Sequence, residues 1–147
     1  MKIAIGSDHA GFALKEIVRQ HLADKGFEVI DVGAYSAERV DYPVYGQKVG
    51  ELVASGEAAK GIVICGSGIG ISIAANKVKG IRAALCSECL SARLSREHND
   101  ANVLAMGARL IGDTMALSIT DTFLAAKFQG GRHQQRVDLL TALDKGE

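Results

Sequence analysis

The feature that most constrains this fold is an alternation of short apolar runs with longer segments of helical periodicity. The runs are continuously apolar, as in strands buried on both faces, and they cover residues 2–7, 27–32, 61–65, 81–86 and 103–106. We expect helices from Phe12 to Gly26, from Pro43 onward, and over residues 69–78, 90–98, 116–128 and 134–143. In the helix from Pro43, the spacing predicts that Val44, Val49, Leu52 and Val53 face inward. The alternation predicts an α/β fold, a three-layer α/β/α sandwich with a largely parallel five-stranded sheet.

Length and charge narrow the class of protein further. The chain has 147 residues, a formal net charge of zero and no linker or repeat, so residues 1–147 are expected to form one domain. A basic excess typical of nucleic-acid binders is absent, and no apolar stretch is long enough for a membrane span or a signal peptide. Three cysteines are an odd number for a disulfide framework, so the default compartment is a reducing cytoplasm.

The strongest candidate for chemistry is the segment Cys65-Gly66-Ser67-Gly68-Ile69-Gly70. A cysteine ends a buried strand, and a glycine-rich turn opens a helix whose free N–H groups stabilise negative charge. The same field favours a thiolate. A base beside an anion-binding turn is what removing a proton next to a carbonyl requires. The alternative is a buried, inert cysteine before a tight turn.

Active sites in such sheets lie at the carboxyl ends of strands, which also selects Asp8 and His9. Both can bind a polar substrate, although Ser7 and Asp8 are equally suited to capping the next helix. His98 and Asn99 follow at the end of a later helix, where the alternative is a helix C-cap with Asn99 in the left-handed position.

A basic segment opens the last predicted helix. Arg132 and Arg136 are four residues apart and share a helix face, with His133 between them. Positive charge is unfavourable at a helix start, and an anionic ligand such as phosphate would remove the conflict. The alternative is a solvated basic face.

Two other motifs support weaker hypotheses. The spacing Gly66-x-Gly68-x-Gly70 differs from a dinucleotide fingerprint, although Glu88 lies where a ribose-binding acid could fall. Cys86 and Cys89 have the C-x-x-C spacing of a redox or half-zinc motif, but no second pair completes a zinc set.

Taken together, the segments resemble the ribose-5-phosphate isomerase B family, grouped with galactose-6-phosphate isomerase subunits. The resemblance covers nearly the whole chain and rests on residues 6–12, 41–43, 65–77, 81–83, 95–104 and 130–136. It implies a Rossmann-like fold, no metal or nucleotide cofactor, and a homodimer or dimer of dimers whose sites are shared between subunits. The last helix, about 133–145, is expected to pack on a partner subunit through an apolar stripe of Val137, Leu140 and Leu143.

The resemblance also implies roles by position. It implies aldose–ketose isomerisation of ribose 5-phosphate and ribulose 5-phosphate through an enediolate, with Cys65 as the base and Ser67 supporting it. The backbone of Gly66, Gly68, Ile69 and Gly70 would stabilise the enediolate, His98 would open the sugar ring with Asp8 or Tyr42, and Asn99 would bind hydroxyls. The phosphate would be held by His9, Arg109, Arg132 and Arg136, with His133 as a further candidate. Some relatives carry a glutamate base where this chain has Ala74, which puts this chain in the cysteine branch.

Two other classes remain open at this point. One is a regulatory module that binds a nucleotide or sugar phosphate on the same fold, because fold does not fix function. The other is an NAD-linked enzyme. The preferred sugar, in the ribose, allose or galactose series, is left open too.

Overall fold

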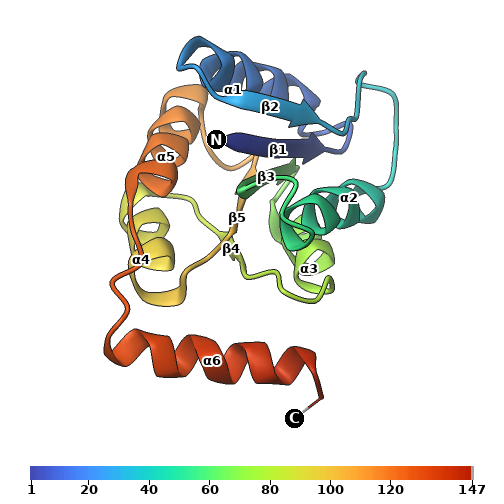
Figure 1. The fold of residues 1–147 in the computed structure, drawn as a ribbon. Helices are drawn as coiled ribbons and strands as arrows, with labels where there is room; N and C mark the ends of the chain where they lie inside the picture. The colour runs from blue at the N-terminus through green and yellow to red at the C-terminus, as the bar shows by residue number, and fades with distance from the viewer. Residues whose placement is uncertain (147) are drawn as a thin grey trace.

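The computed structural model describes residues 1–146 and shows a five-stranded sheet with helices on both faces (Figure 1). The strands pair in the order β2-β1-β3-β5-β4, and every pairing is parallel. Their bounds are β1 (Lys2–Ser7), β2 (Glu28–Asp31), β3 (Lys60–Cys65), β4 (Ala83–Leu85) and β5 (Val103–Gly107). The predicted α/β/α sandwich is confirmed, with a sheet that is wholly rather than largely parallel.

Six helices connect and cover the strands (Figure 1). Helices α2 and α3 lie on one face of the sheet, and α1, α4 and α5 lie on the other, while α6 packs against α4. Their bounds are α1 (Phe12–Asp24), α2 (Tyr42–Ala54), α3 (Ile69–Asn76), α4 (Cys89–Asn99), α5 (Asp113–Ala125) and α6 (Arg132–Asp144). Within residues 1–146, no helix has both the length and the apolar character needed to cross a membrane.

The central strand β3 shows how a continuous apolar run serves two cores. Ile62 and Ile64 point to the core under α1, α4 and α5, whereas Val63 and Cys65 point to the core under α2 and α3. Successive side chains alternate between faces, so a strand covered on both sides is apolar at every position. Cys65 is thus the last buried side chain of its strand.

The inward face of α2 differs from the prediction at one position. Val49 and Val53 are buried, but Val44 is 49% exposed, so its inward placement was wrong. The buried stripe instead includes Gly46 and Gly50, which lie against α3. A Cβ on Gly46 would come within 2.9 Å of the Ala74 Cβ, so these glycines allow close helix packing.

The predicted strand over 81–86 is shorter in the structure, with only Ala83–Leu85 in strand conformation. The Arg82 N–H donates to the Asn102 side-chain oxygen at 2.8 Å, while the Arg82 carbonyl still accepts the Asn102 N–H at 3.0 Å, so regular strand pairing is interrupted at Arg82. β4 is an edge strand with a partner on one side only, where such shortening is common.

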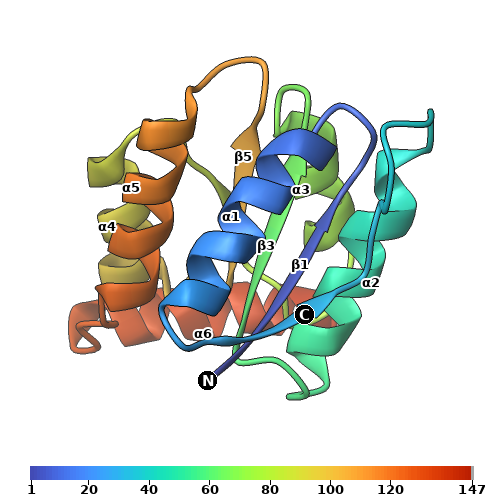
Figure 2. The same cartoon turned by 90° about the horizontal axis from the view of Figure 1, so that it is seen from above.

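The carboxyl ends of the parallel strands lie at one end of the molecule, and the last turn of α4 lies at the other. The connections that leave β1, β3 and β5 gather at one end, and α6 lies toward the other (Figure 2). Because α4 joins two parallel strands, it runs back against them, and its last residue, Asn99, lies just before β5 begins at Val103. The end of α4 is therefore at the amino edge of the sheet.

Candidate active site

A cleft opens at the carboxyl edge of the sheet, between the segments that follow β1 and β3. The chain leaves β1 toward β2 on one side and reaches β3 on the other, so this is the point where strand order reverses. The cleft has a volume of about 640 Å³. It is lined by Asp8, His9, Ala10, Tyr42, Cys65, Gly66, Ser67, Ile69, Gly70, Ile73, Arg109 and Leu110.

The turn between β3 and α3 is built around the Cys65 thiol. Cys65 is 4% exposed, and the Gly68 N–H donates to its Sγ at 3.2 Å. The Ile69 N–H donates to Ser67 Oγ at 3.2 Å, which holds that hydroxyl at the start of α3. Gly68 has φ +78°, and a Cβ there would come within 2.7 Å of the Met106 carbonyl carbon, so only glycine fits. The turn presents sulfur, hydroxyl and helix N-terminus to one cleft, as the sequence predicts.

Asp8 and His9 reach the same cleft from the end of β1 and are fixed by the backbone around them. Asp8 is 6% exposed and accepts a hydrogen bond from the Gly11 N–H at 3.0 Å. That bond shapes the turn before α1, although the helix itself begins without a side-chain cap. His9 Nδ1 lies 3.1 Å from the Val40 carbonyl oxygen and 3.2 Å from the Val40 nitrogen, so the Val40 backbone orients the ring. Within residues 1–146, the other ring nitrogen has no hydrogen-bond partner and is available to a ligand.

The segment between β2 and α2 delivers Tyr42 to the cleft. It is joined to β1 by the Ser7 N–H, which donates to the Gly33 carbonyl at 2.8 Å. Below it Lys15 is fully buried and pairs with Asp31 at 2.7 Å, while the other Asp31 oxygen accepts the Gly33 N–H at 2.9 Å. Burial of a cation is tolerated only when it is paired, so this bond pins the start of the segment.

Tyr42 then lies over the start of α3. A Cβ on Gly70 would come within 2.5 Å of the Tyr42 ring carbon Cζ and 2.9 Å of its hydroxyl oxygen. The ring and the helix can approach this closely only because position 70 has no side chain. Gly70 thus contributes space for Tyr42 as well as a backbone N–H.

Arg109 supplies positive charge at the mouth of the cleft. Its backbone N–H donates to the Gly66 carbonyl at 2.9 Å, which ties the end of β5 to the Cys65 turn. A Cβ on Gly66 would lie 3.1 Å from Arg109 Nη1, so the guanidinium runs alongside this turn. A guanidinium and a helix N-terminus on one cleft suit an anionic ligand.

The remaining predicted site residues do not line this cleft. His98 and Asn99 lie in the last turn of α4, and Arg132, His133 and Arg136 lie in the first turns of α6. The His98 and His133 rings are stacked, with centroids 4.3 Å apart and planes 13° apart. Arg132 and Arg136 are exposed, whereas His133 is buried. The structure therefore divides the predicted set into two groups, one at each edge of the sheet.

The electrostatics of the second group disfavour a charged His133. Its pKa is lowered from 6.5, first by loss of solvation and then by the positive charges that His98, Arg132 and Arg136 can carry. A neutral His133 ring can stack on the His98 ring without charge repulsion. The second group thus combines two exposed arginine side chains with a stacked imidazole pair in which His133 favours its neutral form.

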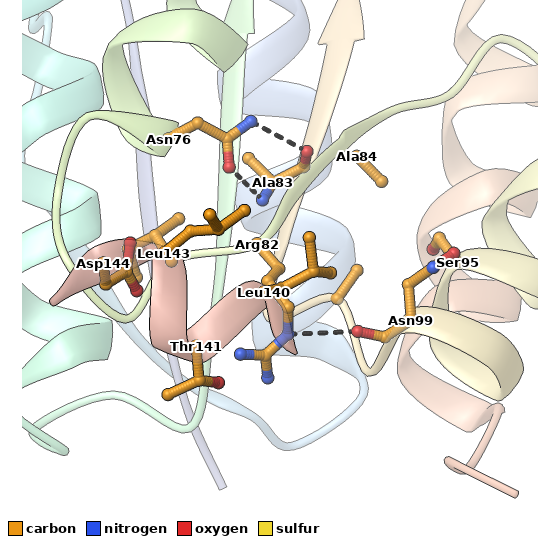
Figure 3. A pocket seen from close by; sticks show the side chains of 12 residues that line it. Asn76, Arg82, Ala83, Ala84, Ser95, Asn99, Leu140, Thr141, Leu143 and Asp144 are labelled. Atoms are coloured by element: carbon orange, nitrogen blue, oxygen red, sulfur yellow. Dashed lines mark hydrogen bonds between the residues drawn. The ribbon is translucent and has the colours of Figure 1, made fainter. Parts of the chain in front are cut away.

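Arg82 holds the end of α4, a role that the sequence analysis missed. Its Nε donates to the Asn99 carbonyl at 3.0 Å (Figure 3). Its Nη2 donates to the Asp100 carbonyl at 2.9 Å. Asp100, with φ +47°, takes the left-handed C-cap position, so the alternative that placed Asn99 there was wrong. Asn99 remains helical and exposed, with its side chain at a pocket of about 390 Å³ under α6. The sequence holds no sign of this role, because it does not show that the segment before β4 lies next to the end of α4.

The competing motifs have structural explanations. Glu88 caps α4 by accepting the Ser91 N–H at 3.0 Å, which accounts for an acid at that position. Burial, and then the charge of Glu88, raises the pKa of the Cys86 thiol to about 11. A thiol with that pKa is a poor nucleophile at neutral pH, which counts against a redox pair with Cys89. Among residues 1–146, no cluster of three histidine, cysteine or acidic side chains could hold a metal ion.

Comparison with known proteins places the chain in a family. The model of the ribose/galactose isomerase family matches residues 3–140. Ribose-5-phosphate isomerase B of Escherichia coli (strain K12) is 56% identical over 144 residues, which is 98% of this chain and 97% of that protein. The predicted family resemblance is therefore confirmed.

Solved structures agree over the whole fold. Ribose-5-phosphate isomerase B of Clostridium thermocellum is 57% identical with a TM-score of 0.98, covering 99% of both chains. The enzyme of Mycoplasma genitalium, solved with bound ribulose-5-phosphate, is 42% identical with a TM-score of 0.95, covering 99% of this chain and 97% of that one. The chain belongs to the ribose/galactose isomerase family of sugar-phosphate isomerases.

Proposed function

We propose that this protein interconverts ribose 5-phosphate and ribulose 5-phosphate. The observation that carries the proposal is the position of the Cys65 thiol. It is buried at the end of β3, it accepts a hydrogen bond from the Gly68 N–H at the start of α3, and it lines an open cleft. The relatives support the choice of sugar, since the E. coli and C. thermocellum proteins are ribose-5-phosphate isomerases and the M. genitalium structure holds the ketose product.

In the proposed chemistry the Cys65 thiolate removes the proton from C2 of the open-chain aldose. The electron pair of that C–H bond forms the C1–C2 double bond, and the C1 carbonyl oxygen becomes the enediolate oxygen. The N–H groups at the start of α3, over residues 66–70, stabilise this negative charge. The Cys65 thiol then returns the proton to C1, the O2–H bond breaks as C2 becomes the ketone, and the O2 proton passes to O1, which becomes the C1 hydroxyl. Both proton transfers are internal to the reaction, so no redox cofactor is consumed. Ser67 holds the sugar beside the sulfur.

Ring opening is assigned to different groups. His98 would act on the ring oxygen, assisted by Asp8 or Tyr42, and Asn99 would bind sugar hydroxyls. The phosphate would be bound by His9 and Arg109 on the Cys65 side of the site and by Arg132 and Arg136 on the other side. Arginine side chains suit phosphate because one guanidinium group can donate two charge-assisted hydrogen bonds to two phosphate oxygens.

A second copy of the chain is needed to bring these groups together. The Cys65 cleft lies at the carboxyl edge of the sheet and His98 at the amino edge, so one chain does not close the site. Apolar side chains exposed near both groups support an interface, with Ile69 and Ile73 on α3 and Leu140 and Leu143 on α6 each at least 43% exposed. We therefore propose a homodimer, or a dimer of dimers, in which each site combines the Cys65 cleft of one subunit with α4 and α6 of the other. The three free cysteines fit a reducing compartment such as the cytoplasm.

The test is conversion of ribose 5-phosphate to ribulose 5-phosphate by purified protein in EDTA with no added cofactor. Turnover that survives EDTA supports the proposal, and loss of turnover on metal removal contradicts it. Ribose, allose and galactose phosphates ranked by kcat/KM give the preferred sugar. A protein that binds these phosphates without converting any of them would instead be a regulatory binding module.

A further inference from the structure

The stacked pair His98 and His133 carries an inference that rests on the proposed role of His98. We propose that His133 is a positioning residue: its ring face fixes the orientation of the His98 imidazole for ring opening, and His133 does not bind the phosphate. This separates it from Arg132 and Arg136, with which the sequence pattern grouped it.

The first support is the contact itself. The two ring planes are nearly parallel, at 13°, with centroids 4.3 Å apart, so one imidazole covers a face of the other. Such stacking restricts rotation of the ring while leaving its nitrogen edge free. Within residues 1–146, no hydrogen bond orients the His98 ring, so we assign this role to the stack.

The second support is burial. His133 is 7% exposed, while Arg132 and Arg136 on either side are exposed. His133 and Val137 are four residues apart, and together they are the buried positions through which α6 packs on α4. A side chain that anchors a helix is turned away from the ligand that its exposed neighbours face.

The third support is that the backbone fixes the stack in place. The Gln129 N–H donates to the Glu97 carbonyl at 3.0 Å, which joins the chain before α6 to the residue preceding His98. The His133 N–H donates to the Gly130 carbonyl at 3.0 Å, in a turn where Gly130 has φ +65°. The backbone of residues 129–133 is thus tied to α4 one residue before His98, which sets the positions from which the two side chains meet.

Charge also distinguishes the two roles. A histidine binds phosphate well as an imidazolium, and the surroundings of His133 favour the neutral ring, as described above. A neutral aromatic face is sufficient for stacking. Phenylalanine should therefore replace His133 in a positioning role but not in a phosphate-binding role.

The experiment compares His133→Phe, which keeps a flat ring, with His133→Leu, which keeps apolar volume without one. Steady-state kcat and KM for ribose 5-phosphate and the inhibition constant of inorganic phosphate are measured for each, with Arg136→Ala as the variant expected to weaken phosphate binding. We expect His133→Leu to lose about tenfold in kcat, because small misplacements of a reacting group cost this much or more. His133→Phe should recover most of that loss, and the phosphate inhibition constant should change less than about twofold in both, a factor within the scatter of single-contact effects.

Three results would overturn the inference: a tenfold weaker phosphate inhibition in His133→Phe, equal losses of kcat in the two variants, or no loss in either. If the His133→Leu variant melts at a lower temperature because α6 is loosened, the inference is tested on His133→Phe alone. A phosphate ligand at position 133 predicts weaker phosphate inhibition in His133→Phe, whereas a stacking role predicts unchanged phosphate inhibition and nearly wild-type kcat. A wild-type protein that does not convert ribose 5-phosphate would refute the proposed function itself, which is a separate outcome.

Discussion

Cys65 and His98 lie at opposite edges of the same parallel sheet. Cys65 ends β3 and pairs with Gly107 at the carboxyl end of β5, whereas the helix that carries His98 ends just before Val103, where β5 begins. The four residue steps of β5 from Val103 to Gly107 cover about 13 Å along the strand at the usual rise per residue. This separation is the reason that we propose a site shared between two subunits.

This separation predicts complementation between inactive variants. Cys65→Ala and His98→Asn subunits, each inactive alone, should give hybrid dimers with about half of the wild-type activity, since one of two sites then has both residues intact. The measurement is turnover of hybrids purified through two different affinity tags. Verified hybrids with no recovered activity would mean that each site is built from one chain.

Replacing Cys65 should remove catalysis while leaving the fold. We expect Cys65→Ala to lower kcat by roughly a thousandfold, within the range of lost acid–base catalysis, with ribose 5-phosphate binding largely kept. Cys65→Ser should fail too, because a hydroxyl does not ionise near neutral pH. Cys89→Ala is the matched control, as that half-buried thiol starts α4 outside the cleft. An alanine variant with most of the wild-type kcat would rule out Cys65 as the base.

Gly70→Ala should separate activity from stability. The added methyl group would displace the Tyr42 ring, which lies 2.5 Å from that position, and we expect kcat/KM to fall by about tenfold or more. Alanine is the better helix former, so the melting temperature should hold or rise. Gly112→Ala is the control, because no atom lies within 4 Å of its Cβ position. An unchanged kcat/KM in Gly70→Ala would show that the placement of Tyr42 is not needed.

Arg136→Ala should weaken phosphate binding. Each charge-assisted hydrogen bond to phosphate is worth about 1.5–3 kcal/mol, so KM for ribose 5-phosphate should rise by about ten- to a hundredfold. Because binding of the phosphate group also positions the sugar for reaction, we expect kcat to fall as well. Arg93→Ala removes the same charge from an exposed residue that pairs with Glu97, and it should change neither constant. Equal KM values for Arg136→Ala and wild type would exclude Arg136 as a phosphate ligand.

His133 makes stability depend on pH in a defined direction. Its pKa is lowered in the folded chain, so the unfolded chain binds more protons as the pH falls below 6.5. This contribution to stability is complete above pH 6.5 and is lost as the pH falls from there toward the folded pKa. Urea unfolding at pH 7.5 and 5.5 should therefore show a smaller loss of stability for His133→Phe than for wild type. Identical losses would mean that His133 does not titrate differently in the two states.

The sequence alone determined the fold class and the Cys65 turn. Short apolar runs that alternate with longer helical patterns are typical of strands covered on both faces, and the glycines after Cys65 indicated a tight turn there. The order of strands and helices, and the residues at the carboxyl ends of β1 and β3, follow from local pattern. Periodicity also located α2, although it misplaced Val44 because the buried stripe of that helix is partly glycine.

Only the tertiary structure decided which candidate residues meet. The sequence gives no distance between His98 and His133, or between Arg82 and the end of α4, because these contacts join segments that are distant along the chain. Tertiary packing brings these segments together, and it depends on the side chains of the whole interface rather than on a local rule. The division of the site between two edges of the sheet has the same origin. It follows from helix direction in three dimensions, which no motif in the sequence displays.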